Sequence, residues 1–349
     1  MKRLLCLFHL LGCLLAMFVP AFAQDRLPAL GADLQQTSVS GISSGGFMAA
    51  QIATAYSSRF IGAGIIAAGP FYCAGSTGTD DYRTNAMAFC MGPATSAVGA
   101  SGQKAFEQAG EFAAQGKIDP LAGVQRQRIY IFSGANDKTV KTAVVDQTDA
   151  FYRAAGLGPE QILYDQNRNA GHSIVTANPD DLPCNAEKPP YINNCDFYQS
   201  HVLLRHIYPQ RKAAPGKDGL RGRLLRFDQD EFAKGAYTSM DTVAWVYVPA
   251  SCDKGGCAVH VAFHGCHQGS QTVGERFYKG TGYNEFADTN RLIVLYPQAR
   301  TSDLAGNPKG CWDFWGYSDP KTFYTREAPQ MRAVIAMLDR LGQPRAAQP

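Results

Sequence analysis

The sequence predicts an α/β protein built around a largely parallel sheet. Short apolar, β-rich runs alternate along the chain with stretches of helical periodicity, a pattern typical of strands joined by crossover helices. Of the 349 residues, 45% are hydrophobic and 18% are charged, the balance of a globular protein with a sizeable core. The net charge of +3 is too small to predict nucleic acid or an anionic membrane as a partner.

The first part of the chain supplies the clearest alternation. In chain order we predict a strand ending at 37–40, a helix at 44–56, strands at 61–68 and 128–132, a helix at 146–155, a strand at 161–164 and a helix at 196–208. In the first helix, Phe47, Met48 and Ile52 fall on one face. Pro209 ends the last one, because proline cannot continue a helix.

Residues 209–219 form a polar stretch that predicts an exposed linker, with three basic residues, two prolines and two glycines. Strand patterns resume after it, and a closing helix follows. We predict these strands at 243–248, 259–263 and 292–296, and the helix at 328–341. Because both parts carry strands of the same kind, we expect them to build one sheet and one catalytic domain.

The first 23 residues are predicted to be a cleaved secretory signal. Two basic residues precede an apolar stretch at 4–19, and residues 21–23 match a small-residue cleavage site. The stretch is short for a membrane-spanning helix, and lipid attachment at Cys13 is disfavoured because more apolar residues follow it. We therefore expect a mature chain of residues 24–349 that is exported, extracellular or periplasmic, and has no membrane partner.

Cysteine usage agrees with export. Cys6 and Cys13 leave with the leader, and the eight remaining cysteines predict four disulfides in an oxidising compartment. Eight cysteines can pair in 105 ways, but close spacing favours two of the pairs, and two more complete the set. The two pairs favoured by spacing are Cys252–Cys257 and Cys184–Cys195. The two that complete the set are Cys73–Cys90 and Cys266–Cys311. No CxxC pair occurs, so a zinc site is not expected.

The strongest functional signal is the pentapeptide Gly41-Ile42-Ser43-Ser44-Gly45, which has the pattern G-x-S-x-G. This pattern places a nucleophilic serine on a tight strand-to-helix turn, where glycines avoid steric clashes. It occurs by chance in many proteins, but here it follows a predicted strand and opens a predicted helix. We therefore predict Ser43 as a nucleophile and the backbone N–H of Ser44 as a donor to the oxyanion.

A serine nucleophile needs a base, and the base needs an orienting carboxylate. When a strand-to-helix turn carries the serine, the acid and then the histidine follow it along the chain, each after a strand. Asp137 follows the strand at 128–132 and His172 follows the strand at 161–164, so we predict a Ser43–Asp137–His172 triad. The alternatives are Asp137 as a helix cap, Asp165 as the acid, and His201, His206 or His260 as the base. The first two of these histidines lie on a helix and the third lies in a strand, where structural roles are favoured.

The segment from Val261 to Gly269 follows an apolar strand and contains His264-Gly265, typical of a loop that donates a second backbone N–H to the oxyanion. We predict that N–H to be the one of Cys266. A metal site at His264, Cys266 and His267 is the alternative, disfavoured because no further ligand has a fitting spacing. In ordinary α/β-hydrolases this loop precedes the nucleophile, whereas here it follows it, so we infer a circular permutation joined at 209–219.

An aromatic cluster lies in the loop-like region that begins at Cys311. It includes Trp312, Trp315 and Tyr317, which we predict to be substrate-binding residues that form an apolar wall near the mouth of the site. The alternative is core packing.

Taken together, these motifs resemble one family. The segments SVSGISSGGFMAAQ, GANDKTV, AGHSIVT, VAFHGCHQG, GYNEFADTNRLIVLYPQA and CWDFWGY, in this order, look like those of extracellular poly(3-hydroxybutyrate) depolymerases with a circularly permuted catalytic domain. The resemblance implies an α/β-hydrolase fold and hydrolysis of short-chain polyhydroxyalkanoates through an acyl-enzyme, without a metal or cofactor. It implies the same triad and the same two oxyanion donors.

The expected partners are therefore a polyester surface or soluble hydroxyacyl oligomers, acted on by a monomer. The chain ends soon after its last helix, without the linker and polymer-binding domain of many members, so it is similar to the single-domain type. Two other functions stay open at this point. One is an esterase for feruloyl or acetyl-polysaccharide esters, and the other is a non-catalytic secreted polymer-binding protein.

Overall fold

The computed structural model describes residues 26–93, 99–212, 219–234 and 237–345. The predicted secretory signal lies outside the described residues, and most of the predicted linker at 209–219 does as well.

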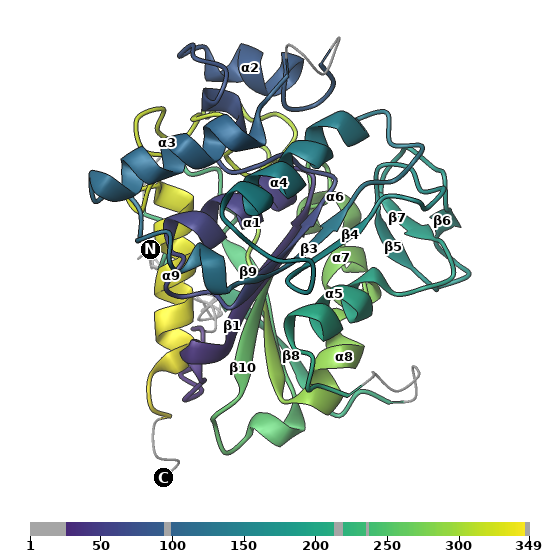
Figure 1. Cartoon of the computed structure of the whole chain (residues 1–349). Helices are drawn as coiled ribbons and strands as arrows, with labels where there is room; N and C mark the ends of the chain where they lie inside the picture. Colours follow the sequence, from purple (N-terminus) through teal and green to yellow (C-terminus); the bar gives the residue numbers. More distant parts are fainter. Residues whose placement is uncertain (1–25, 94–98, 213–218, 235–236, 346–349) are drawn as a thin grey trace, which may run out of the picture.

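An eight-stranded sheet forms the centre of the molecule (Figure 1), in the order β4-β3-β2-β1-β10-β11-β9-β8. Its strands are β1 (Thr37–Ile42), β2 (Gly62–Ile66), β3 (Arg128–Phe132), β4 (Ile162–Asp165), β8 (Arg223–Asp228), β9 (Val243–Val248), β10 (Ala258–Phe263) and β11 (Leu292–Tyr296). The six strands from β4 to β11 run parallel, whereas β9 pairs antiparallel with β11 and β8 with β9.

The two parts of the chain meet at the centre of this sheet. Strand β1 lies parallel to β10, with Val39 beside Val261 and Gly41 beside Phe263, although more than half of the chain separates them. Because parallel neighbours end at the same edge of a sheet, the segments that follow Ile42 and Phe263 emerge side by side. Every residue of β1 and β10 is buried, as expected for central strands covered on both faces.

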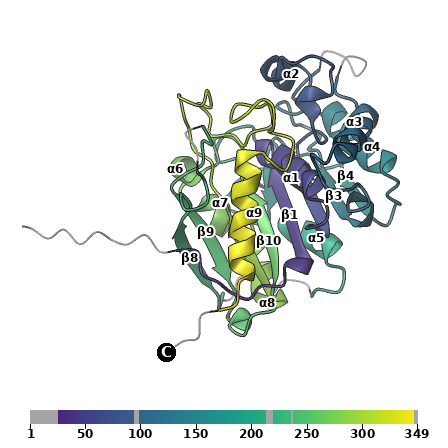
Figure 2. The same cartoon turned by 90° about the vertical axis from the view of Figure 1, so that its left-hand side faces the viewer.

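Helices cover both faces of the sheet (Figure 2). On one face lie α1 (Ser44–Ala55), α3 (Gly102–Ala114), α4 (Thr142–Ala154) and α9 (Pro329–Gly342), whose buried side chains share one apolar core. On the other face lie α5 (Gln199–Ile207), α7 (Arg276–Gly280) and α8 (Tyr283–Asn290), which share a second core. Two short helices, α2 (Tyr82–Ala88) and α6 (Ser270–Val273), lie near the edge where β1 and β10 end.

A smaller three-stranded sheet lies beside the main one (Figure 1). It consists of β5 (Ile174–Thr176), β6 (Leu182–Pro183) and β7 (Ile192–Asn194), in the order β5-β7-β6. The structure contains the four predicted disulfides: Cys184–Cys195 and Cys252–Cys257, which spacing favoured, and Cys73–Cys90 and Cys266–Cys311, which complete the set.

Two helices begin at residues other than the predicted ones. The helix predicted at 146–155 already begins at Thr142, because Val144 and Val145 are buried against the sheet. The helix predicted at 196–208 begins only at Gln199, because Asp196 adopts a left-handed conformation with φ of 65°. The sequence analysis did not identify β8, the small sheet, α2, α3 or the helices α6 to α8, which are short, edge-located or polar on one side.

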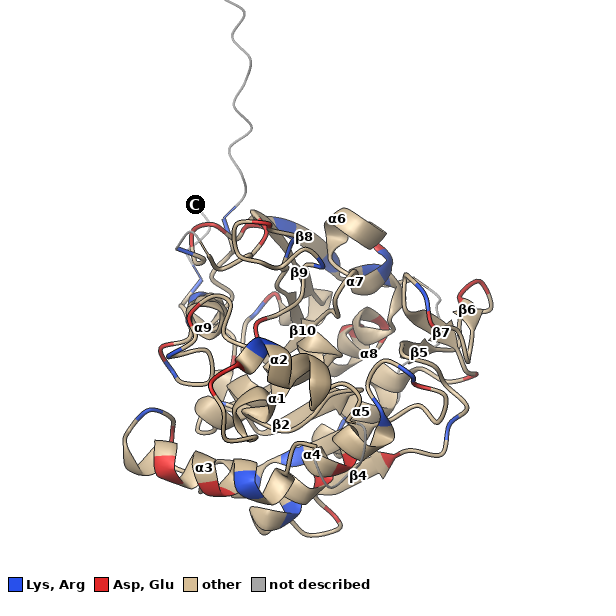
Figure 3. Cartoon of the chain, turned by 90° about the horizontal axis from the view of Figure 1, so that it is seen from above, with Lys and Arg blue, Asp and Glu red and all other residues tan. Residues whose placement is uncertain are grey.

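Charged residues of both signs are spread around the molecule (Figure 3), and their numbers nearly balance, with 33 Lys and Arg against 30 Asp and Glu. In the described part of the chain, none of the helices has the length and apolar character needed to cross a bilayer. Within the same residues, no three His, Cys, Asp or Glu side chains gather in a way that could hold a metal ion.

Candidate active site

Ser43 lies on a tight turn between β1 and α1. Its φ of 56° and ψ of −126° are rare for a residue with a side chain, and they are the strain expected where a nucleophile is lifted out of a sheet. The flanking glycines are required by space. A Cβ on Gly41 would lie 2.2 Å from the carbonyl oxygen of Gly45, and one on Gly45 would lie 2.4 Å from the carbonyl oxygen of His264. The second of these contacts also shows that the segment after β10 packs directly on the turn.

Asp137 and His172 meet across the loops that follow β3 and β4. His172 Nδ1 lies 2.8 Å from Asp137 Oδ2, and both side chains are buried. Asp137 Oδ1 accepts hydrogen bonds from the backbone N–H groups of Thr139 and Val140, each at 2.8 Å. The Asp137 carboxylate therefore caps a turn of its own loop and not a helix, because α4 begins only at Thr142. Its second oxygen is free to accept the Nδ1 proton of the imidazole.

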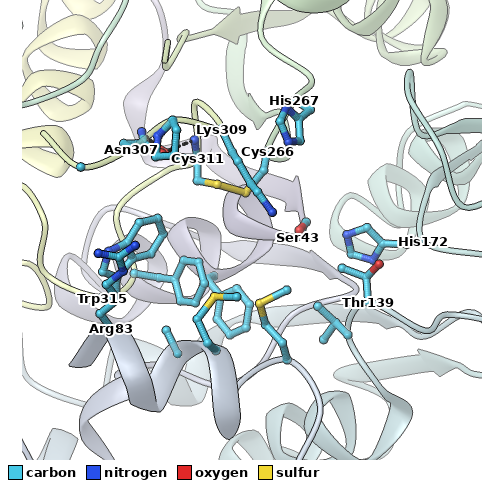
Figure 4. Close-up of a pocket in the computed structure, with 18 of the residues that line it drawn as sticks. Ser43, Arg83, Thr139, His172, Cys266, His267, Asn307, Lys309, Cys311 and Trp315 are labelled. Atoms are coloured by element: carbon cyan, nitrogen blue, oxygen red, sulfur yellow. Dashed lines mark hydrogen bonds between the residues drawn. A yellow bond between two sulfur atoms is a disulfide. The ribbon is translucent and has the colours of Figure 1, made fainter. Parts of the chain in front are cut away.

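His172 faces Ser43 across a cavity (Figure 4). With Nδ1–H donated to the carboxylate, the lone pair of the ring lies on Nε2, which is the state a general base requires. A serine that faces a histidine paired in this way with a carboxylate can lose its hydroxyl proton to that histidine as it attacks a carbonyl.

Two backbone N–H groups are placed to receive the charge that develops on such a carbonyl. Ser44 is the first residue of α1, where backbone N–H groups lack an acceptor within the helix. In the segment after β10, Gly265 N–H is bonded to Gln268 Oε1 at 2.7 Å and His267 N–H to the Lys309 carbonyl at 2.8 Å. Between them, Cys266 N–H has no acceptor among the described residues, like that of Ser44.

The segment that carries Cys266 is tightly held. Gln268 Nε2 donates to the carbonyls of Pro190 and Tyr191, at 2.9 and 3.0 Å. The Cys266–Cys311 disulfide joins the segment to the aromatic region. His264 is fully buried, with Nδ1 2.7 Å from the Gly265 carbonyl and Nε2 accepting from Ala299 N–H at 3.0 Å. Both ring nitrogens are thus occupied, and Cys266 Sγ is in the disulfide, so two of the three residues of the metal site considered as an alternative cannot act as ligands.

The cavity in front of Ser43 has a volume of about 370 Å³, within the range of small-molecule sites. Its walls are mainly apolar, and they include Phe47, Met87, Met91, Phe314 and Trp315. The Phe47 and Phe314 rings stack with their centroids 4.2 Å apart.

The lining of the cavity also has a charge bias. Arg83 and Lys309 contribute to it, and no Asp or Glu does so among the described residues. The site therefore tolerates an anionic product.

Of the three predicted substrate-binding residues, the structure places only Trp315 at the cavity. Trp312 has 0% exposure and packs on Phe263, so the prediction that it binds substrate is wrong and the core-packing alternative holds. Tyr317 does not line the cavity either, because its hydroxyl donates to the Cys311 carbonyl at 2.7 Å.

This segment turns inward because of the buried Asp313. Its carboxylate accepts hydrogen bonds from the backbone N–H groups of Trp315, Gly316, Tyr317 and Ser318. Burial raises the pKa of the Asp313 carboxyl, although the hydrogen bonds from Ser318 and its neighbours oppose the shift.

Several lining residues were not singled out from the sequence: Arg83, Met87, Met91, Thr139, Tyr191 and Lys309. For Met87 the sequence held one signal, a large apolar residue within a short, mostly polar segment, and the structure leaves this side chain 59% exposed on α2. Phe47, predicted to share one face of its helix with Met48 and Ile52, belongs to the apolar core and lines the cavity as well.

The rival acid and bases are engaged elsewhere. Asp165 pairs with Arg168 at 3.1 Å, and His206 and His201 bond backbone carbonyls through Nε2. His260 lies between the hydroxyls of Ser38 and Ser40, at 2.6 and 2.8 Å.

The fold and this site define a class: an α/β-hydrolase fold with the Ser–His–Asp arrangement of serine hydrolases, built from strands in a permuted order. No family model matches the chain. Among curated proteins, it is 40% identical to a poly(3-hydroxybutyrate) depolymerase of Delftia acidovorans and 34% identical to a polyhydroxybutyrate depolymerase of Talaromyces funiculosus.

The alignments cover 91% and 87% of this chain, and 62% and 89% of the two relatives. The chain thus spans less than two thirds of the length of the Delftia protein. Among solved structures, it is similar to a PHB depolymerase from Penicillium funiculosum, with 31% identity, a TM-score of 0.79, and coverage of 91% of this chain and 98% of the other. A structure of a serine-to-alanine variant of a PHB depolymerase with an R3HB trimer matches equally well. The chain belongs to the family of poly(3-hydroxybutyrate) depolymerases.

Proposed function

We propose that the protein is a secreted serine esterase that hydrolyses the ester bonds of poly(3-hydroxybutyrate), or related short-chain polyhydroxyalkanoates, and of their oligomers. The observation that carries the proposal is the Asp137–His172 pair facing Ser43 at an apolar cavity, in a chain of this family. The R3HB trimer bound by the serine variant of a similar depolymerase supports the same substrate class.

The proposed reaction has two halves. His172 Nε2 takes the Ser43 proton as Oγ attacks the ester carbonyl, and Ser44 and Cys266 N–H stabilise the oxyanion. The imidazolium then protonates the departing alcohol end of the chain, which leaves a hydroxyacyl group on Ser43. A water molecule, deprotonated by His172, attacks this ester, the bond between the acyl carbon and Ser43 Oγ breaks, and the imidazolium returns the proton to Oγ as the acid is released. Every proton is carried by residues of this chain, so the reaction requires no cofactor.

The cavity suits a repeating aliphatic ester. Apolar walls contact the methyl and methylene groups of such a chain, and the backbone N–H groups recognise the one polar group that recurs in it. Arg83 and Lys309 favour the carboxylate that each cleavage produces. We assign substrate contact to Trp315, the member of the aromatic cluster that lines the cavity.

We further propose that residues 24–349 form one catalytic domain that acts outside the cytoplasm. Four disulfides suit an oxidising compartment. The contribution of both parts of the chain to one sheet supports circular permutation over a division into two domains.

The decisive experiment measures the loss of turbidity of a poly(3-hydroxybutyrate) suspension for the wild type and Ser43→Ala, with products identified by mass spectrometry. Clearing by the wild type alone, with hydroxybutyrate or its oligomers released, is the expected result. If a folded wild type cleaves p-nitrophenyl esters but leaves the polymer intact, the substrate is another ester, and feruloyl and acetyl-polysaccharide esters are tested next. A lack of reaction with a serine-directed phosphonate would instead indicate a binding protein.

A further inference from the structure

A carboxylate outside the triad joins the loop of the acid to the loop of the base. Glu187 Oε1 accepts hydrogen bonds from the backbone N–H groups of His172 and Lys138, each at 3.0 Å. Glu187 Oε2 accepts one from the hydroxyl of Thr139 at 3.1 Å. One side chain thus contacts the base itself and the two residues that follow Asp137.

Glu187 belongs to a turn that is itself held against the base loop. Gly171 N–H donates to the Cys184 carbonyl at 2.9 Å, and a Cβ on Gly171 would lie 2.4 Å from the Ala186 carbonyl oxygen. The buried Asn193 donates from Nδ2 to the carbonyls of both Cys184 and Ala186, at 2.9 Å each.

The chain around this turn is a closed unit. After His172 the chain enters β5, forms the small sheet with β6 and β7, and is closed by the Cys184–Cys195 disulfide. The segment that forms the small sheet therefore packs the turn containing Glu187 against Gly171, the residue that precedes His172.

The contacts explain what this segment supplies to the site. A triad functions only when its members stay within about half an ångström of the productive geometry. Asp137 and His172 come from different loops, and the bond between them is a single contact of 2.8 Å. The residues that precede the two triad members are also joined, because Asn136 N–H donates to the Ala170 carbonyl at 3.0 Å. Hydrogen bonds to a carboxylate are stronger than those between neutral groups, so Glu187 adds a firm link between the loops, and this link reaches His172 itself.

We propose that Glu187 is a positioning residue for the triad, which clamps the Asp137 loop to the His172 loop and thereby sets the alignment of the base with Ser43. The proposal rests on the serine esterase chemistry proposed above, but not on the identity of the polymer.

The test compares Glu187→Ala with Glu187→Gln, which keeps an oxygen for the two backbone N–H groups. The readouts are kcat and KM on p-nitrophenyl butyrate and the rate at which a fluorophosphonate labels Ser43. For Glu187→Ala we expect kcat and the labelling rate to fall roughly 10- to 100-fold, with KM within about twofold of the wild type, because misplacement of a catalytic group costs up to about 100-fold. Glu187→Gln is expected to stay within about threefold of the wild type.

The matched control is Glu111→Ala, which removes an exposed glutamate of α3 that takes no part in the site. It is expected to match the wild type. If Glu187→Ala does not fold, Thr139→Val removes one of the three contacts and is expected to lower kcat about threefold to fivefold, since it deletes one hydrogen bond.

A wild-type kcat in Glu187→Ala, an equal loss in both Glu187 variants, or a loss that appears only in KM would overturn the proposal. A wild type that is labelled by the phosphonate but does not clear polymer would change the proposed substrate and leave this test valid. A wild type that is not labelled would remove the proposed esterase function first.

Discussion

Two regions at the same edge of the sheet each contain a histidine, and the two histidines have opposite surroundings. In the loop that follows β4, His172 donates a hydrogen bond from Nδ1 to the Asp137 carboxylate, and its Nε2 faces the cavity. In the segment after β10, His264 has both ring nitrogens engaged by backbone groups, those of Gly265 and Ala299. One ring can exchange protons with a substrate, whereas the other holds two pieces of backbone together.

The difference shows what makes a buried histidine reactive. Burial without a carboxylate lowers the pKa of His264 to about 4 and that of His260 to about 3, so both rings stay neutral. A base needs one nitrogen bonded to an acceptor that stabilises the charged ring and the other nitrogen left for the reaction. Of the histidines described here, His172 meets both conditions.

The largest effect is expected for His172→Ala. The loss of the base removes nucleophile activation, so kcat on p-nitrophenyl butyrate should fall on the order of 10⁶-fold. The free energy of unfolding should fall by only about 1–2 kcal/mol, because Asp137 Oδ2 loses its partner while Oδ1 keeps the N–H groups of Thr139 and Val140. Urea unfolding checks the second point. A loss of activity that accompanies a comparable loss of stability would place His172 with His264 as a structural residue.

At acidic pH, the free energy of unfolding should fall because His260 and His264 are held neutral in the folded protein. In the unfolded chain a histidine has a pKa of about 6.5, above the folded values of about 3 and 4 for His260 and His264. Between these limits the unfolded state binds more protons, so the free energy of unfolding rises with pH and is lost as the pH falls below about 6.5. From pH 7.5 to pH 5 the loss should be about 2 kcal/mol for each ring.

Urea unfolding at the two pH values measures this loss, and His260→Asn should remove the roughly 2 kcal/mol that this ring contributes. A loss that is the same in the variant and the wild type would show that these rings do not account for it.

His264→Ala should reverse the pattern of His172→Ala. The free energy of unfolding should fall by about 2–4 kcal/mol, because the Gly265 carbonyl and Ala299 N–H lose their partners in the core. We expect kcat to fall only about 10- to 100-fold, through displacement of the Cys266 N–H. Chemical denaturation and steady-state kinetics on the same preparation test both values. An activity loss as large as that of His172→Ala would contradict the comparison.

The smallest effect is expected for His201→Ala, the rival base on α5. Its Nε2–H donates to the Gly282 carbonyl at 2.8 Å, away from the cavity. We expect kcat within about twofold of the wild type and a stability loss of about 1 kcal/mol, the value of one hydrogen bond. A tenfold loss of kcat with unchanged stability would reopen the assignment of the base.

How much could be read from the sequence differs between the two regions. The turn at Ser43 depends on local chemistry, because glycines must flank a serine where β1 meets α1, and the pattern of residues contains that requirement. Asp137 and His172 each follow a strand, and parallel strands end at one edge, so their approach was predictable from the order of elements. The small sheet was not predictable, since its strands are two or three residues long.

Trp312 and Trp315 show most clearly what the sequence could not predict. They lie three residues apart in one aromatic run, and composition alone assigns both to a substrate wall. Their different positions depend on Asp313, whose carboxylate accepts hydrogen bonds from backbone N–H groups that follow it and so turns the chain. Trp312 is left in the core, and Trp315 lies at the cavity.

The nature of the chemistry could thus be deduced from residue order alone, because a nucleophile on a strand-to-helix turn, an acid and a base after successive parallel strands must converge. Folding alone decided which aromatic rings face the substrate, which histidines are locked by backbone, and that Glu187 bridges the two triad loops. Such choices depend on contacts between segments that are distant in the chain, and no local pattern of residues records those contacts.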